Sequence, residues 1–149
     1  MTKNTYDFPC PAVTLRPIGY VVREPRAEDK SISALRSQPV RIVIDPEFEP
    51  GLLGINPGRD LLVLYYMHGA SGNTLQVHPR GDRSRPLRGV FDTRSPVRPN
   101  PIGVTTVQVQ QVTGNVIEVL GLDALDSSPV LDIKHHSTTF DQPYGEGED

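Results

Sequence analysis

Hydrophobic and polar residues alternate along much of this chain, with the two-residue period of β-strands that bury one face. Between Val107 and Gln110, for example, the valines point to one side and the glutamines to the other. Residues 61–67 are apolar throughout instead, which is typical of a strand covered on both faces. Alternation and β-branched content together predict strands at 18–22, 40–44, 61–67, 74–77, 89–92, 103–112, 116–121 and 130–133.

The breaks between these strands predict turns and very little helix. Thr113–Asn115 joins two of the strands as a tight hairpin, because Gly114 and Asn115 tolerate positive φ. Residues 45–54 can form one or two helical turns, since Pro46 suits a first turn and a glycine can end it. Many short strands, little helix and no repeat predict a mainly β fold, a small single-domain β-barrel with one or two short helical turns.

Composition favours one loop-rich globular domain. The 149 residues are 36% hydrophobic, enough for a single core, but 15 prolines and 13 glycines favour loops. No linker indicates a second domain. We expect an N-terminal extension at 1–14, the barrel domain at 15–136, and an acidic tail at 137–149 that is disordered or packs only on a partner.

Cysteine content and apolar runs indicate the compartment. Cys10 is the only cysteine, so the chain can form neither an intrachain disulfide nor a cysteine-built zinc site. The first residues lack the apolar run of a signal peptide, and the longest apolar run, 61–67, is too short to span a membrane. We therefore expect a soluble cytoplasmic protein without membrane contact.

The formal net charge of −3 gives no overall attraction to nucleic acid, so any such contact must be local. One basic cluster lies between residues 80 and 98, where the only acids are Asp82 and Asp92. Its members are Arg80, Arg83, Arg85, Arg88, Arg94 and Arg98. These arginines can steer a phosphate backbone or form a solvated basic loop, and the sequence leaves both open.

Proline stiffens the end of this cluster. Pro96, Pro99 and Pro101 each fix φ, lack an N–H, and push the preceding residue toward extended conformations. A loop of this kind can hold Arg94 and Arg98 at a fixed separation for a planar anion such as a carboxylate or a phosphate. An ordinary proline-rich surface loop is the alternative.

Four motifs appear in order along the chain: PIGYVV at 17–22, LLVLYYMHG at 61–69, TRSPVRPNPIG at 93–103 and LDALDSSPVLDIK at 122–134. Together they resemble the landmarks of the TsaA-like, TrmO-type family of S-adenosylmethionine-dependent tRNA methyltransferases. The resemblance implies a small β-barrel that forms a homodimer and binds S-adenosylmethionine near the subunit interface, without a metal. It also implies N6-methylation of threonylcarbamoyl-adenosine beside the tRNA anticodon, or of a related acceptor.

The resemblance assigns cofactor contacts to several parts of the chain. Arg94 would contact the cofactor, and His68 with Gly69 would line its pocket. The segment 126–129 would offer hydrogen bonds, and 37–39 would form a further wall. The implied cofactor residues are Arg94, His68, Gly69, Ser37, Gln38, Pro39, Asp126, Ser127, Ser128 and Pro129.

Simpler structural roles are open for the same residues. Arg94 can pair with Asp92 or another acid, and His68 can be an ordinary strand-end histidine. Asp126 and Ser127 can cap a turn. The glycine-rich strand-to-helix fingerprint of dinucleotide-binding folds is absent from the sequence, so a Rossmann-type methyltransferase is not expected.

The acceptor side of the reaction is assigned to the LDIK motif and to the arginine loop. Asp132 can accept a proton from the acceptor amine or bind it, and Lys134 can neutralise a phosphate or a carboxylate. The two residues share one face of a strand, and an exposed charge pair is the alternative. Arg98, Asn100 and Arg88 are expected to shape the loop or to face RNA.

Two departures from the family pattern bear on the acceptor. Ser127, Ser128 and Pro129 stand where relatives carry Gly-Thr-Pro, and His135 with His136 stands where they carry Pro-Tyr. Adjacent strand residues point to opposite faces, so the two histidines cannot easily share one metal ion. One of them can replace the aromatic ring, and His136 is the third catalytic candidate.

Two other classes of function compete with the methyltransferase. A barrel that binds S-adenosylmethionine or RNA without catalysis would also account for the departures. A metal-dependent enzyme could use His68, His78 and one of the C-terminal histidines, but no pair of them has the ligand spacing of a helix or a strand.

Overall fold

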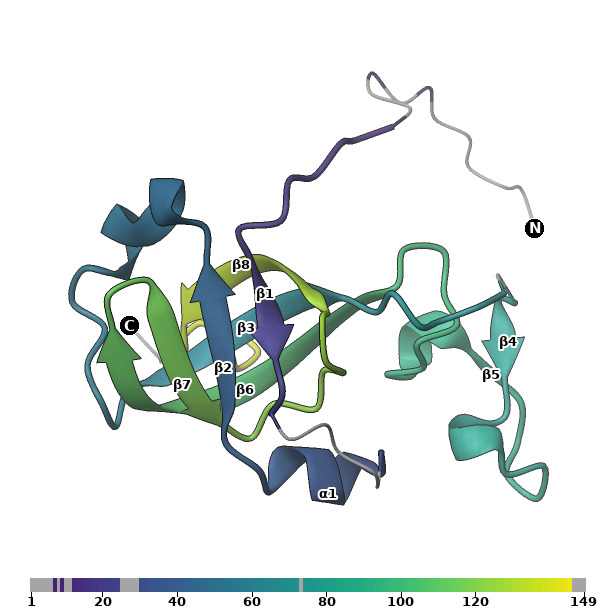
Figure 1. Cartoon of the computed structure of the whole chain (residues 1–149). Coiled ribbons are helices and arrows are strands. Elements are labelled where there is room, and N and C mark those ends of the chain that lie inside the picture. Colours follow the sequence, from purple (N-terminus) through teal and green to yellow (C-terminus); the bar gives the residue numbers. More distant parts are fainter. Residues whose placement is uncertain (1–6, 8, 10–11, 25–29, 73, 146–149) are drawn as a thin grey trace.

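The computed structural model describes residues 7, 9, 12–24, 30–72 and 74–145. Six strands close into a barrel in the order β1-β2-β7-β6-β3-β8, and all neighbours are antiparallel (Figure 1). These strands are β1 (Gly19–Val22), β2 (Val40–Ile44), β3 (Asp60–Tyr66), β6 (Ile102–Thr113), β7 (Val116–Leu120) and β8 (Pro129–His135). The predicted fold class is confirmed.

An arm projects from one end of the barrel between β3 and β6 (Figure 1). It contains the short pair β4 (Gln76–Val77) and β5 (Arg88–Gly89), and the 3-10 turns η2 (Pro79–Gly81) and η3 (Val90–Asp92). The predicted strands at 74–77 and 89–92 are therefore shorter than expected. The basic cluster of the sequence lies on this arm.

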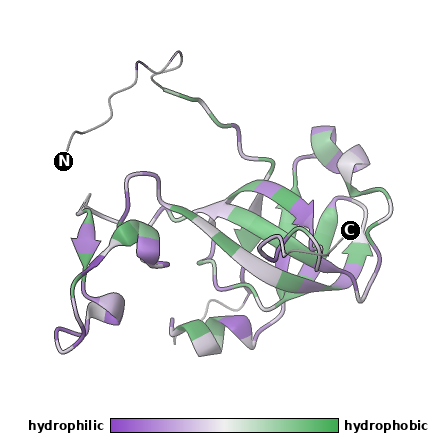
Figure 2. Cartoon of the chain, turned by 180° about the vertical axis from the view of Figure 1, so that it is seen from behind, coloured by the Kyte–Doolittle hydropathy of each residue, from purple (hydrophilic) through white to green (hydrophobic). Residues whose placement is uncertain are grey.

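The alternation of the sequence places one apolar row inside the barrel, and Figure 2 shows the alternation as changing bands along the strands. The fully buried side chains of the barrel strands are Val21, Ile42, Ile44, Val63, Val109, Ile117, Val119 and Val130. Val107 and Val109 point inward while Gln108 and Gln110 are exposed, as predicted.

β3 departs from its prediction on the outward face. Leu61, Val63 and Tyr65 are buried. On the outward face, Leu62 and Leu64 are only half-buried, and Tyr66 is 42% exposed. The expectation of a strand covered on both faces is therefore wrong for a single copy of the chain, because a barrel strand has only one face toward the core.

The hairpin between β6 and β7 is confirmed, with the turn at Gly114 and Asn115. Only Gly114 takes positive φ, at 59°. Asn115 contributes differently: its Nδ2 donates to the carbonyl oxygen of Ile44 at 2.6 Å. The turn is thereby fastened to the end of β2.

The predicted helical turns at 45–54 are the 3-10 helix η1 (Pro46–Leu52), in which Asp45 accepts the N–H of Glu47 at 3.0 Å. The α-helix α1 (Ile32–Arg36) was not predicted. It is a single turn in which only Leu35 is buried, too short for a helical period to show in the sequence.

The described part of the tail includes a turn. Asp141 accepts the backbone N–H of Ser137 at 2.7 Å and donates its own to the Ser137 carbonyl oxygen at 2.9 Å. The expected disorder or partner packing of the tail stays a prediction. Residues 146–149 and Cys10 lie outside the described residues. Among the residues with described positions, no helix has the length and apolar character needed to cross a bilayer.

Candidate functional site

A cavity of about 1020 Å³, which we call the first cavity, opens where the barrel meets the arm. Its walls come from 30–36, from β3 with 67–70, from 91–98, from β6 and from 123–128, with His136 and Asp141 at one side. Elements far apart in the sequence thus build one hollow. Its size is at the upper end for a small-molecule site.

The proline loop carries Arg94 and Arg98 to this cavity, but the two arginines have different surroundings. Arg98 Nη1 donates to the carbonyl oxygens of Thr93 and Ser95 at 3.2 and 3.1 Å. The side chains of Thr93 and Ser95 accept further backbone N–H groups of the same loop. Arg98 therefore braces the loop from inside, in agreement with its predicted shaping role.

Arg94 is exposed, and within the described residues its side chain makes one hydrogen bond, from Nη1 to the carbonyl oxygen of Val104 at 3.3 Å. No ion pair joins Arg94 to Asp92 or to another acid among the described residues. Asp92 Oδ2 instead lies 3.5 Å from Nη1 of Arg88. The role of Arg88 toward RNA stays a prediction. The Arg94 guanidinium can therefore offer most of its donors to a ligand in the cavity.

His68 and Gly69 follow β3 after Met67, and both line the first cavity. The end of β3 is tied to the proline loop, because Met67 donates its N–H to the Pro101 carbonyl oxygen at 2.7 Å. Asn100, also on this loop, is exposed and does not line the cavity.

Of the four residues at 126–129, only Ser128 lines the first cavity. It is buried and its Oγ donates to the Leu125 carbonyl oxygen at 2.7 Å. Asp126 and Ser127 lie instead along a groove beside 20–24, where Asp126 Oδ1 accepts the Arg23 N–H at 2.8 Å. Ser127 has a φ of 67°, a left-handed conformation that glycine adopts at lower cost than serine. Asp126 and Ser127 thus lie in a turn, which is the structural alternative that the sequence left open for them.

The other expected wall, 37–39, does not line the first cavity. Ser37 follows α1 and its Oγ donates to the Ala34 carbonyl oxygen at 2.8 Å. The preceding residues Lys30, Leu35 and Arg36 line the cavity instead. Cofactor contacts by Ser37, Gln38, Asp126, Ser127, Pro39 and Pro129 stay predictions.

Asp132 and Lys134 form an ion pair at 2.7 Å on the outer face of β8, opposite Leu64 and Leu62 of β3. The hydrogen bond and the charge of Asp132 raise the pKa of Lys134 above its usual value. Both residues line a second cavity of about 680 Å³ and not the first. Their shared face is confirmed, and the ion pair matches the alternative of an exposed charge pair.

The two histidines reach different surroundings. His135 lies near Arg59, with Nδ1 at 3.5 Å from Arg59 Nη1. His136 lines the first cavity, with Nε2 at 3.6 Å from Oδ2 of Asp141. Of the three catalytic candidates, Asp132, Lys134 and His136, only His136 therefore lines the same cavity as Arg94.

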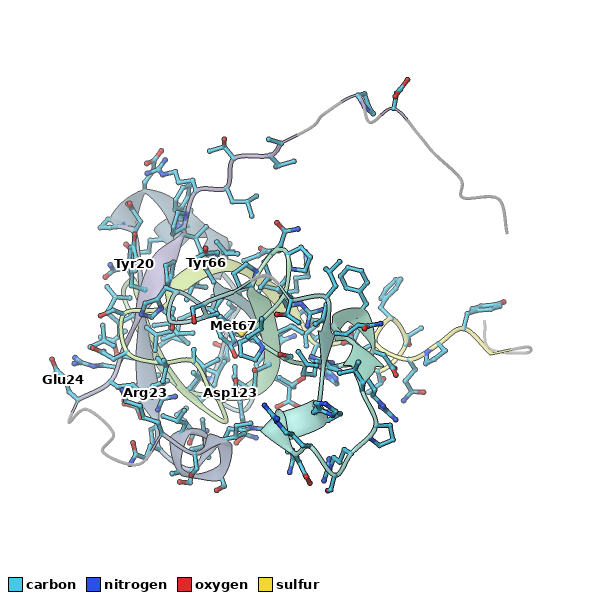
Figure 3. All side chains as sticks on the ribbon, turned by 90° about the vertical axis from the view of Figure 1, so that its right-hand side faces the viewer. Tyr20, Arg23, Glu24, Tyr66, Met67 and Asp123 are labelled. Carbon is cyan, nitrogen blue, oxygen red and sulfur yellow. The ribbon has the colours of Figure 1, made fainter. Side chains whose placement is uncertain are left out.

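Sequence reasoning missed a polar cluster at the inner wall of the first cavity, which we call the Asp123 cluster: Tyr65, Thr105 and Asp123. The Tyr65 hydroxyl donates to Asp123 Oδ1 at 2.9 Å, and Thr105 Oγ1 donates to the same oxygen at 2.5 Å. Burial and the neighbouring carboxylate raise the pKa of Tyr65, so the phenol remains a donor. Figure 3 shows Asp123 below Met67 at this end of the barrel.

Arg23 lies beside Asp123 in Figure 3 and was also missed. It is 3% exposed, and its guanidinium donates to the carbonyl oxygens of Ala124, Leu35 and Leu122 at 2.7, 3.2 and 2.6 Å. Burial lowers its pKa, while Asp123 acts in the opposite direction. The available signal was a charged residue directly after the apolar strand at 18–22.

Within the described residues, no three His, Cys, Asp or Glu side chains gather as metal ligands. His78 lies on the arm, where its Nδ1 is 2.8 Å from the Arg85 carbonyl oxygen. The alternative of a metal enzyme built on His68, His78 and a C-terminal histidine therefore gains no support.

The family described as the tRNA-methyltransferase O N-terminal domain matches residues 25–142. An S-adenosyl-L-methionine-binding protein of Archaeoglobus fulgidus is 45% identical over 130 residues, 85% of this chain and 91% of that protein. A probable S-adenosyl-L-methionine-binding protein of Methanothermobacter thermautotrophicus is 41% identical over 132 residues, 87% of this chain and 93% of that protein.

Similarity to proteins of greater length is partial. A mouse tRNA (adenine(37)-N6)-methyltransferase is 33% identical over 96 residues, 64% of this chain and 22% of that protein. The crystal structure of TrmO from Pseudomonas aeruginosa superposes with a TM-score of 0.65 at 25% identity, covering 92% of this chain and 61% of that one. The chain thus spans about three fifths of the length of that TrmO structure.

Proposed function

The chain belongs to the TrmO N-terminal domain family, and on that premise we propose that it is an S-adenosylmethionine-dependent methyltransferase acting on tRNA. The proposed acceptor is N6 of threonylcarbamoyl-adenosine next to the anticodon, or a related base, in line with the name of the mouse relative. The observation that carries the proposal is that Arg94, His68 and Gly69 all line the first cavity.

The residues of the first cavity fit the chemistry of S-adenosylmethionine. Leu35, Met67 and Leu125 provide apolar surface for a purine ring. Arg94 provides a cation for the amino acid carboxylate. The Asp123 cluster provides a carboxylate oxygen near the same wall, suited to the positive groups of the ligand. A pocket with both signs of charge and an apolar surface matches a ligand with all three features.

When bound, S-adenosylmethionine supplies an electrophilic methyl group, and the chain must hold it in line with the acceptor nitrogen. We propose that Arg94 fixes the cofactor and that the braced proline loop keeps Arg94 in place. Lys134 stays cationic, because Asp132 raises its pKa, so it suits binding a phosphate and not removing a proton. Leu62, directly opposite Lys134 in the β3–β8 pair, lines the first cavity. An acceptor held by Lys134 can thus approach that cavity from the β8 side, where Asp132 and His136 are the proposed catalytic groups.

We also propose that two copies form a homodimer through the outward face of β3 and β6. Tyr66, Ile102 and Val104 are 42%, 37% and 37% exposed there, beside the half-buried Leu62 and Leu64. An apolar sheet face of this kind is typical of an interface. Light scattering of the purified chain is expected to give twice the mass of one chain, and a monomer at all concentrations would contradict the dimer.

Methyl transfer can be tested directly. The chain is incubated with methyl-labelled S-adenosylmethionine and total tRNA from cells that lack its gene, and the labelled nucleoside is identified by mass spectrometry. We expect label in N6-methylated threonylcarbamoyl-adenosine. Binding of the cofactor without label in any nucleoside would support the non-catalytic alternative, and absence of binding would remove the proposal altogether.

A further inference from the structure

We propose that His136 accepts the proton of the acceptor nitrogen, and that Asp141 positions the imidazole for this step. The inference rests on the proposed function, because the step belongs to methyl transfer at the first cavity. It concerns this chain in particular, since His136 stands where the family pattern has a tyrosine. The sequence assigned no role to Asp141.

His136 follows the last residue of β8 and lines the first cavity. Its backbone N–H donates to the Asp60 carbonyl oxygen at 3.2 Å, so the residue continues the pairing of β8 with β3. The imidazole is 28% exposed, which leaves it accessible to a ligand. His135, one residue earlier, belongs to the opposite face and lies near Arg59.

Asp141 faces this imidazole from the turn that follows β8. Its Oδ2 lies 3.6 Å from His136 Nε2 and accepts the Ser137 N–H at 2.7 Å. The Asp141 N–H donates in turn to the Ser137 carbonyl oxygen at 2.9 Å. Because two backbone hydrogen bonds fix the carboxylate, it can hold the ring with the proton on Nε2, and Nδ1 is then the nitrogen that accepts a proton.

The other candidate bases are less suited to this step. Asp132 has both oxygens engaged, Oδ2 with Lys134 at 2.7 Å and Oδ1 with the Ile133 N–H at 2.9 Å. Asp123 lines the first cavity but already accepts two hydroxyl groups, and a carboxylate is a weaker base than an imidazole. His68, the other histidine of this cavity, has no carboxylate partner among the described residues.

The proposed step balances in atoms and electrons. The acceptor nitrogen forms a bond to the methyl carbon, the bond from that carbon to sulfur breaks, and its electron pair stays on the sulfur. The proton of the nitrogen passes to His136 Nδ1. The imidazolium then faces the Asp141 carboxylate until it releases the proton to water. A positioned general base contributes about 10²–10⁴-fold to a rate.

The experiment measures the single-turnover rate of transfer from methyl-labelled S-adenosylmethionine to total tRNA from cells that lack the gene. His136→Ala should lower the rate at saturating tRNA about 100-fold. The dissociation constant of S-adenosylmethionine, by calorimetry, and the tRNA concentration for half of the maximal rate should stay within about twofold of wild type. Added imidazole should restore part of the rate, because it replaces the missing base without restoring any packing.

His135→Ala is the matched control for this measurement. His135 is the neighbouring histidine, belongs to the opposite face of the strand, and does not line the first cavity. Its removal should leave the rate near that of wild type, with no response to imidazole.

Asp141→Asn tests the positioning role. It should lower the rate about tenfold, the effect of losing one charge-assisted hydrogen bond, without a change in cofactor affinity. Asparagine still offers an oxygen to the Ser137 N–H, so the turn is kept. In a His136→Ala background the same substitution should cause no further loss, since a positioning residue acts through the group that it positions. A full further loss in that background would overturn the role of Asp141.

The remaining outcomes separate this inference from the proposed function. A rate that stays unchanged in His136→Ala, or that falls without any response to imidazole, would overturn the assignment of the base and leave the methyltransferase intact. A response to imidazole in His68→Ala instead would do the same. A wild-type chain that labels no nucleoside would overturn both. Should His136→Ala fail to fold, by circular dichroism, His136→Gln decides by the same loss of rate at unchanged cofactor affinity.

Discussion

Replacing Arg23 with methionine should lower the free energy of unfolding by about 4 kcal/mol, because three buried carbonyl oxygens lose their donor at once. Those oxygens belong to Ala124, Leu35 and Leu122, so the guanidinium joins β1 to α1 and to the loop after β7. Methionine fills much of the same volume without supplying any N–H group. The loss is measured by urea denaturation followed by circular dichroism.

Arg41→Met is the matched control for this measurement. Arg41 lies on the neighbouring strand β2 and pairs with Glu24 at 2.7 Å, but both side chains are largely exposed. An exposed ion pair contributes about 0.2–1 kcal/mol, so the control should change stability little. Equal losses in the two variants would show that the buried hydrogen bonds of Arg23 do not stabilise the fold as its contacts indicate.

Local pattern was sufficient to predict the barrel strands. The strand at 40–44 and the hairpin at 113–115 follow from residue type alone, since alternation and a Gly-Asn pair act over a few neighbouring residues. The outward face of β3 could not be predicted in the same way. Leu62 and Leu64 are as apolar as the inward residues, and their exposure depends on what packs outside the barrel.

The site was predicted only in part, for a related physical reason. The proline loop, His68 and Gly69 form contiguous motifs, and the structure brings all of them to the first cavity. The Asp123 cluster joins residues from β3, β6 and the loop after β7, so its members meet only through strand register.

Arg94→Ala should raise the dissociation constant of S-adenosylmethionine about 100-fold, the effect of losing a guanidinium contact to a carboxylate. Among the residues whose positions are described, the Arg94 side chain makes one long hydrogen bond, at 3.3 Å, so its removal should leave the fold unchanged. Calorimetric titration measures the binding loss, and thermal unfolding checks the fold. Arg83→Ala is the control, an exposed arginine of the same arm that does not line the first cavity.

Lys134→Ala should have the complementary effect on the proposed reaction. Lys134 lies on the outer face of β8 and does not line the first cavity, so cofactor affinity should stay within about twofold of wild type. Methyl transfer to tRNA should fall instead, because a cation that binds the acceptor is lost while the partner Asp132 is left unpaired. Measuring both quantities for both variants separates the two roles. If Lys134→Ala lost cofactor binding and Arg94→Ala lost only methyl transfer, the cofactor would occupy the outer face and the acceptor the cavity, which is the reverse of the assignment made from Arg94.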